Sequence, residues 1–201
     1  MNLELGGRLD AENGQSTARF AFFHSTKHNE RNTDPLLPVV TLSGKRHVAG
    51  LELDLAGRLS PKWEVFSSYT WMPIAKVDKA APCPATGGCA QGAIGERPGD
   101  RPALTPHYSA VAWTTYQLDP RFRFGAGLNA RGKQRPTRVA FHVPAYVTLD
   151  LMAEYAVILD RFILKANLNN VTDKLYAEQL YPAHYVPGAG RNLQVTATVK
   201  F

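Results

Sequence analysis

Apolar and polar residues alternate along most of this chain. Because successive side chains of a strand point to opposite faces, a period of two predicts β-strands. The alternation is clearest in residues 122–131, 147–155, 162–169 and 193–201, and helical periodicity is weak throughout. The pattern predicts nine strands, over residues 2–10, 15–28, 45–59, 62–74, 107–118, 121–133, 145–157, 161–170 and 191–201.

The connections between these strands alternate between short and long. The short ones are residues 11–14, 60–61, 119–120 and 158–160, and the long ones are residues 29–44, 75–106, 134–144 and 171–190. Outer-membrane barrels have short periplasmic turns and long extracellular loops, whereas a soluble β-sandwich has no reason for this regularity. We therefore predict an all-β fold, an antiparallel transmembrane β-barrel. A soluble β-sandwich that acts as a binding module is the alternative.

Two further features favour the barrel. The predicted strands have about 10–15 residues, longer than the usual 5–6 of soluble sheets and long enough to cross a bilayer at a tilt. Trp63, Trp71, Tyr108 and Tyr116 lie toward strand ends, where the aromatic girdles of such barrels lie. Aromatic residues are also common in strands generally, so the girdle supports the barrel without deciding it.

Composition excludes several classes of protein. The 201 residues are 44% hydrophobic and carry a net charge of +6, which excludes a disordered chain, and 16 Gly and 2 Cys exclude collagen-like and disulfide-dense scaffolds. The basic residues are scattered, which does not suggest nucleic-acid binding. We find no Walker loop and no hydrolase or zinc-protease motif, and His24 and His28 are too far apart for a compact metal site. We therefore expect no enzyme, no catalytic residue, no metal site and no cofactor.

The last third of the chain, NLNNVTDKLYAEQLYPAHYVPGAGRNLQVTATVKF, resembles the C-terminus of a TonB-dependent outer-membrane receptor. Its elements are the strand end at residues 168–171, the Thr172-Asp173-Lys174 and Leu175-Tyr176 steps, and the Gly-Arg pair before the final strand. Residues 44–71 and 106–132 also resemble the family. Within it, the likeness is greatest to ferric-siderophore receptors of the catecholate type.

The resemblance implies a barrel of 22 strands, of which nine would be less than half. The family also has a signal peptide, a TonB box and a plug domain, and none of them is visible in residues 1–201. We therefore expect these residues to be the C-terminal part of a receptor barrel, an open sheet on its own. A truncated gene, a split gene or a partial sequence would each explain this.

The function that the resemblance implies is TonB-energised uptake of ferric siderophores across the outer membrane of a Gram-negative cell. TonB, ExbB and ExbD would act through the missing N-terminal part, and the barrel would contact lipopolysaccharide. The terminal Phe201 would be the signal for the barrel-assembly machinery. A passive porin-like channel, a structural barrel, and uptake of haem, cobalamin or another chelate remain alternatives.

Ferric catecholate complexes are anionic and aromatic, which suits arginine, histidine and tyrosine side chains in the long loops. The alternative is a solvated basic loop surface that faces anionic lipopolysaccharide. Arg123 and Arg131, on the polar side of their strand, could instead pair with carboxylates of a plug. The candidate ligand-binding residues are Arg97, Arg101, Arg135, Arg138, His142, Tyr176, Tyr181, His184 and Tyr185.

Cys83 and Cys89 lie six positions apart in the longest loop. In an oxidising compartment we expect them to form a disulfide that restrains the ends of that loop. A metal site is a weaker alternative, because the spacing is not Cys-x-x-Cys and no histidine is near.

Overall fold

The computed structural model describes residues 1–11, 14–31, 42–80, 96–137, 139, 141–181 and 184–201. Its regular structure, over these residues, is all β, which confirms the predicted fold class. None of them forms a helix that is long and apolar enough to cross a membrane. The strands are β1 (Asn2–Asp10), β2 (Ser16–Arg31), β3 (Leu42–Ser60), β4 (Trp63–Lys79), β5 (Tyr108–Gln117), β6 (Phe122–Arg131), β7 (Tyr146–Ile158), β8 (Phe162–Asn169), β9 (Ala177–Tyr181), β10 (His184–Pro187) and β11 (Asn192–Val199).

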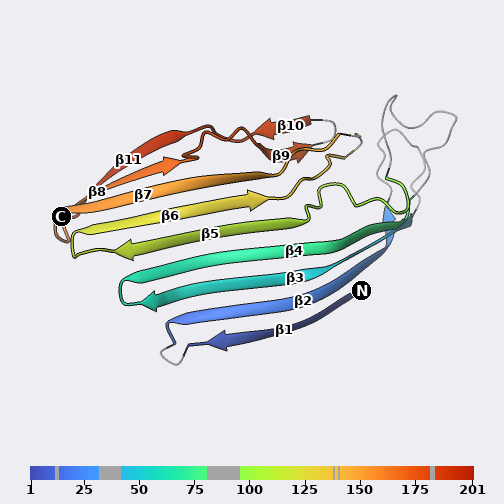
Figure 1. Cartoon of the computed structure of the whole chain (residues 1–201), viewed down its shortest axis with the longest axis horizontal. Coiled ribbons are helices and arrows are strands. Elements are labelled where there is room, and N and C mark those ends of the chain that lie inside the picture. The colour runs from blue at the N-terminus through green and yellow to red at the C-terminus, as the bar shows by residue number, and fades with distance from the viewer. Residues whose placement is uncertain (12–13, 32–41, 81–95, 138, 140, 182–183) are drawn as a thin grey trace.

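Nine of the described strands form one open antiparallel sheet in the order β1-β2-β3-β4-β5-β6-β7-β8-β11 (Figure 1). The short turns all lie at one end of the strands, at the left of Figure 1, and the long connections lie at the other. We call these the turn end and the loop end. The chain terminates at the turn end with Phe201, and its N-terminus lies toward the loop end. The alternation of loop lengths read from the sequence therefore separates the two ends of the sheet.

The predicted strands coincide with those of the sheet to within a few residues, and the predicted ninth strand is β11. The largest difference is at the loop end of β4, where pairing continues to Val77, opposite Arg46, and to Lys79, opposite Lys45. The prediction of one long loop over residues 171–190 was wrong in part, because β9 and β10 form a separate two-stranded hairpin there. These short strands are too brief to give a readable alternation.

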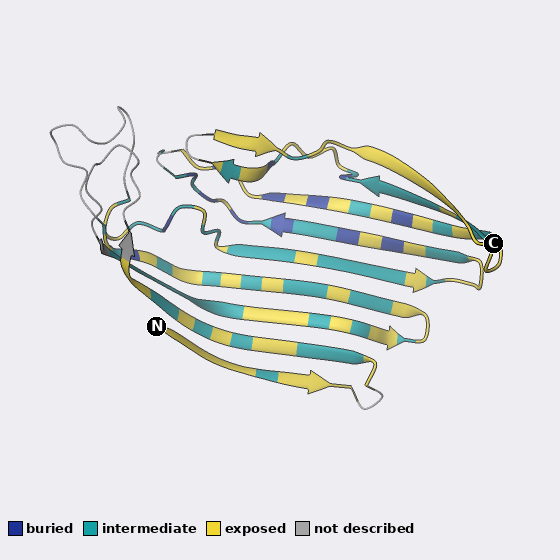
Figure 2. Cartoon of the chain, turned by 180° about the vertical axis from the view of Figure 1, so that it is seen from behind, coloured by how far each residue is buried: buried dark blue, intermediate teal, exposed yellow. Residues whose placement is uncertain are grey.

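The two faces of the sheet differ in chemistry, as the pairing of β6 with β7 shows. Phe124 lies opposite Ala153 on one face, whereas Arg123 lies opposite Glu154 on the other. The Arg123 Nη2 and Glu154 Oε1 atoms are 3.0 Å apart. We call these sides the apolar face and the polar face. The banding of buried and exposed positions along the strands follows this alternation (Figure 2).

Large apolar side chains remain exposed on the apolar face. Phe22 is 56% exposed, Trp71 47% and Leu151 47%. An apolar surface spread over so many strands is unfavourable in water, because burial of apolar area is the main driving force of folding. The apolar face is therefore suited to contact with an apolar medium.

The side chains that are buried include a group at the loop end, above the polar face. Val77 of β4 is 1% exposed, and Val143 and Tyr146, which flank the start of β7, are 7% and 6% exposed. Pro136, from the connection between β6 and β7, is also fully buried. Segments outside the strands therefore pack onto the sheet here and form a small core.

The connection from β8 to β11 is organised by one buried side chain, Asn170, which is 4% exposed. Its Nδ2 donates to the carbonyl oxygens of Lys174 (2.9 Å) and Ala189 (3.0 Å), and its Oδ1 accepts from the Lys174 amide (2.8 Å). The Arg191 amide donates to Asp173 Oδ1 at 2.8 Å. These contacts join the two ends of the connection and bring β11 beside β8. The Asn-Asn-Val-Thr-Asp-Lys segment that carried the family resemblance thus has a structural role, which is to hold the connection between β8 and β11.

Candidate ligand-binding site

Residues 96–106 fold back onto the polar face at the loop end of β4, and we call this segment the strap. Two backbone hydrogen bonds attach it to the strand: Val77 N donates to Asp100 O and Gly99 N donates to Val77 O, both at 2.8 Å. The strap turns tightly here because Gly99 has a φ of +96°, which glycine adopts without a steric penalty. Val77 is buried beneath this turn.

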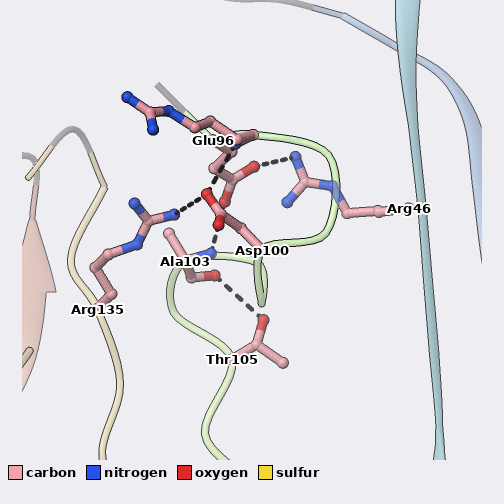
Figure 3. Close-up of polar contacts among 7 residues, drawn as sticks. Arg46, Glu96, Asp100, Ala103, Thr105 and Arg135 are labelled. Carbon is pink, nitrogen blue, oxygen red and sulfur yellow. Dashed lines mark hydrogen bonds and ion pairs between the residues drawn. The ribbon is translucent and has the colours of Figure 1, made fainter. Parts of the chain in front are cut away.

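Two ion pairs connect the strap to its neighbours (Figure 3). Glu96 Oε2 lies 2.9 Å from Arg46 Nη2 on β3, and Glu96 Oε1 accepts a hydrogen bond from the Ala103 amide at 2.6 Å. Asp100 Oδ2 lies 3.9 Å from Arg135 Nη2, in the connection between β6 and β7. Glu96 is thus held by one hydrogen bond and one close ion pair, whereas the Asp100–Arg135 contact is too long for a hydrogen bond.

The Arg101 guanidinium braces the strap from within. Its Nε donates to the Thr105 carbonyl at 2.9 Å, and its Nη2 donates to the carbonyls of Met72 (2.5 Å) and Pro106 (2.9 Å). Burial lowers the pKa of Arg101, but guanidinium is so basic that it keeps its charge. Arg101 was predicted to bind ligand. That role stays a prediction, and the geometry gives this side chain a structural one.

The charges of this region do not balance. Four arginines (Arg46, Arg97, Arg101 and Arg135) face two strap carboxylates, which leaves an excess of two positive charges. Arg97 is exposed, and its backbone amide, not its side chain, donates to Asp100 Oδ2 at 2.9 Å. The Arg135 side chain is 12% exposed, and its Nη2 has no hydrogen-bond partner in the described structure. The loop end of the polar face can therefore attract an anion.

A second group of candidate residues lies on the β9–β10 hairpin. The Tyr181 and His184 rings are stacked at a centroid distance of 5.1 Å, and the Tyr181 hydroxyl donates to Gln179 Oε1 at 2.8 Å. Tyr185 is 47% exposed. The hairpin therefore presents aromatic surface at the loop end, in the connection from β8 to β11 (Figure 1).

Tyr176, just before the hairpin, packs against Tyr146 at a ring-centroid distance of 4.6 Å. Burial and then the charge of Glu178 raise the pKa of Tyr176, so this phenol stays neutral in ordinary buffers. Its packing makes it a support for the hairpin.

The structure brings some of the predicted residues together and separates others. Arg97, Arg101 and Arg135 gather at the strap, and Tyr181, His184 and Tyr185 gather on the hairpin. His142 is exposed in the connection between β6 and β7. Arg138, Cys83 and Cys89 lie outside the described residues, so the predicted disulfide stays a prediction.

The sequence did not single out the strap's partners. Arg46 lies within a predicted strand and Glu96 and Asp100 are acidic, and none of the three is among the predicted ligand-binding residues. The sequence signal that could have indicated Arg46 is a polar residue at the loop end of a strand, on the polar face. The described residues hold no cluster of three or more His, Cys, Asp or Glu that could bind a metal ion.

Comparison with known proteins gives one consistent result. The family model described as TonB dependent receptor-like, beta-barrel matches residues 1–171. The probable TonB-dependent siderophore receptor PiuA of Acinetobacter baumannii is 30% identical over 98% of this chain, and the metal-pseudopaline receptor CntO of Pseudomonas aeruginosa is 27% identical over 98%. The alignments cover 26% and 27% of these relatives, so the chain spans about a quarter of their length.

The solved structures agree in fold. The crystal structure of the siderophore receptor PiuA from Acinetobacter baumannii superposes with a TM-score of 0.82 at 28% identity, over 98% of this chain and 27% of that one. The nine-stranded sheet is thus the counterpart of part of that structure.

Proposed function

The chain belongs to the TonB-dependent receptor family, a family of transport receptors, and we propose that it forms part of the barrel wall of an outer-membrane receptor for ferric siderophores. The apolar face would contact the acyl chains of the outer membrane, and the polar face would line the barrel interior. The loop end would then face the cell exterior and the turn end the periplasm. Phe201, at the turn end, would be presented to the barrel-assembly machinery.

The observation that carries this proposal is the excess positive charge at the strap. Ferric siderophore complexes that are anionic would be drawn to guanidinium groups, which offer several donors in a fixed plane. Arg135 Nη2 is buried 3.9 Å from Asp100 and makes no hydrogen bond, so a ligand that displaces the strap residues covering it could accept from this donor without breaking a hydrogen bond. Arg97 would add a second cation, and the Tyr181–His184 pair would supply an aromatic surface. The names of PiuA and CntO support a chelated metal as the ligand class.

Transport in this proposal needs no covalent chemistry and no resident cofactor. The ligand would bind at the loop end and would pass along the polar face after TonB, with ExbB and ExbD, acts on the inner part of the receptor. The residues of this chain would hold the ligand by charge and by stacking, and the strap, braced by Arg101, would fix the position of the cations.

A binding experiment tests the proposal. We would titrate the folded chain in detergent micelles with a ferric tris-catecholate and follow quenching of tryptophan fluorescence. Charged hydrogen bonds contribute about 1.5–3 kcal/mol each, so Arg135→Gln should weaken binding at least tenfold. Arg135→Lys, which keeps the charge, should recover part of the affinity. Arg8→Gln, at the turn end and paired with Asp10, is the matched control.

The proposal fails if the wild-type chain does not bind the ferric complex, or if Arg8→Gln weakens binding as much as Arg135→Gln. Parallel titrations with haem, cobalamin and a metal complex of an amino-carboxylate chelator distinguish the ligand classes. The relationship to the metal-pseudopaline receptor CntO makes the last of these the second candidate. Ion conductance in planar bilayers, without any ligand preference, would instead indicate a passive porin-like channel.

A further inference from the structure

The carboxylate of Asp100 lies beside the guanidinium of Arg135 without bonding to it (Figure 3). Asp100 Oδ2 is 3.9 Å from Arg135 Nη2, beyond hydrogen-bond range, and this Nη2 is buried with no hydrogen-bond partner in the part of the chain that the structure describes. Buried donors in proteins are nearly always paired with an acceptor. The contact thus balances charge but leaves one donor unused, so Asp100 and an incoming anion would compete for the same cation.

Backbone hydrogen bonds fix the positions of both residues. The Asp100 amide donates to the Arg97 carbonyl at 3.0 Å across a turn that contains Gly99, and the Arg97 amide donates to Asp100 Oδ2 at 2.9 Å. The oxygen that faces Arg135 is therefore the same one that closes the turn. On the other side, the Arg135 carbonyl accepts from the Leu104 amide at 2.9 Å, which ties the backbone of Arg135 to the strap. The fold, not chance contact between mobile side chains, thus places this carboxylate beside this guanidinium.

We propose that Asp100 is a specificity-determining residue of the candidate ligand-binding site, an internal anion that keeps small inorganic anions away from Arg135. An anion that approaches Nη2 meets the like charge of Asp100 and must displace the strap residues that cover this donor. Phosphate would gain little besides its contact with Arg135, whereas a ferric chelate would also reach Arg97 and the Tyr181–His184 pair. Only the larger ligand would therefore offset the cost. This inference rests on the proposed function.

The substitution Asp100→Asn isolates the effect of this charge. It removes the like charge but keeps a side-chain oxygen that can accept from the Arg97 amide, so the turn should survive. Two unit charges about 4 Å apart change affinity about fivefold even in bulk water, so phosphate should bind Asp100→Asn at least about fivefold more tightly than the wild type. The difference should shrink at high salt, because the Asp100 side chain is 41% exposed. The affinity for a ferric tris-catecholate should change less, because its charge is spread over all its catecholate oxygens.

Competition by inorganic phosphate tests the inference. The full chain in detergent micelles would be titrated with a ferric tris-catecholate at increasing phosphate, with tryptophan fluorescence as the signal. The phosphate inhibition constant should fall at least about fivefold in Asp100→Asn. The double variant D100N/R135Q should lose this gain, because Arg135 is the proposed phosphate contact. Asp10→Asn, which makes the same charge change at the turn end beside Arg8, is the matched control and should behave like the wild type. Asp100→Ser, whose hydroxyl oxygen can also accept from the turn, replaces Asp100→Asn if that variant does not fold.

Three results would overturn the inference. They are equal phosphate inhibition of the wild type and Asp100→Asn, an equal gain in Asp10→Asn, and loss of ferric-chelate binding by a folded Asp100→Asn, which would mean that Asp100 binds a cationic group of the ligand. Isothermal titration calorimetry with phosphate alone separates this inference from the proposed function. If the wild type binds no ferric chelate, the proposed function fails, whereas tighter phosphate binding by Asp100→Asn would still support the role of Asp100 at Arg135.

Discussion

Replacement of Asn170 by alanine should destabilise the sheet by about 4 kcal/mol. The side chain makes three hydrogen bonds, to the amide and carbonyl of Lys174 and to the carbonyl of Ala189, and each is worth about 1 kcal/mol. Asn170 also has a φ of +48°, a conformation that asparagine tolerates better than alanine does, and this adds about 1 kcal/mol. The loss should fall on the β8–β11 pairing first, because these bonds join the two ends of that connection.

A urea titration of the chain folded in micelles, followed by tryptophan fluorescence, measures this loss. With a slope of about 2 kcal/mol per molar urea, the midpoint should fall by about 2 M. Asn169→Ala is the matched control, because Asn169 makes one exposed side-chain bond, to Asn192, and should lose about 1 kcal/mol or less. Equal midpoints for Asn170→Ala and Asn169→Ala would refute the reasoning.

Two further predictions concern the loop end. Gly188→Ala should destabilise the chain by about 1–3 kcal/mol, because the new methyl group would overlap the Tyr176 ring. Near-ultraviolet circular dichroism should show a changed tyrosine signal. An unchanged spectrum together with an unchanged urea midpoint would contradict this prediction. Burial, then the nearby charges of Arg101 and Lys133, lower the pKa of His107, so the unfolded chain takes up this proton at a higher pH than the folded chain. Stability should therefore be highest above about pH 6.5 and should fall as the pH drops toward the folded-state pKa of His107. Between about pH 8 and pH 5, the urea midpoint of His107→Gln should fall less than that of the wild type. An equal fall in the two proteins would contradict a role of His107 in this pH dependence.

Much of the fold could be predicted because a strand with one apolar and one polar face has a clear period of two. The predicted range 2–10 matches β1, and the final strand was found from the alternation that ends at Phe201. The loop end of β4 was missed because the register shift between Trp71 and Ile74 changes the phase of the alternation, so that Val77 lies on the polar face. Backbone hydrogen bonds to the neighbouring strand hold this end of β4, and the pattern of apolar and polar residues does not show them. The β9–β10 hairpin was missed for a related reason, since strands of five and four residues give too little pattern to read.

The candidate site was predicted in residue type more than in arrangement. Arginines in the long loops were predicted to bind an anionic ligand, and three of them gather near the strap, but their role in binding stays a prediction. The sequence could not show that Arg101 would use its donors on three backbone carbonyls, because that depends on the path of the strap. It also could not show that Arg46 of β3 would contact Glu96 of the strap on the polar face. Contacts between residues distant in the chain come from the fold, which local patterns do not encode.

The strand order suggests how this wall assembles. Every pairing from β1 to β8 joins strands that are consecutive in the chain, so each new strand can pair with the free edge of its predecessor. The pairing of β8 with β11 departs from this rule, since the β9–β10 hairpin intervenes. This is also the place where a buried asparagine fastens both ends of the connection. The pairing that skips two strands thus coincides with the connection that Asn170 fastens, and a chain without this side chain should assemble β1 to β8 but leave β11 undocked.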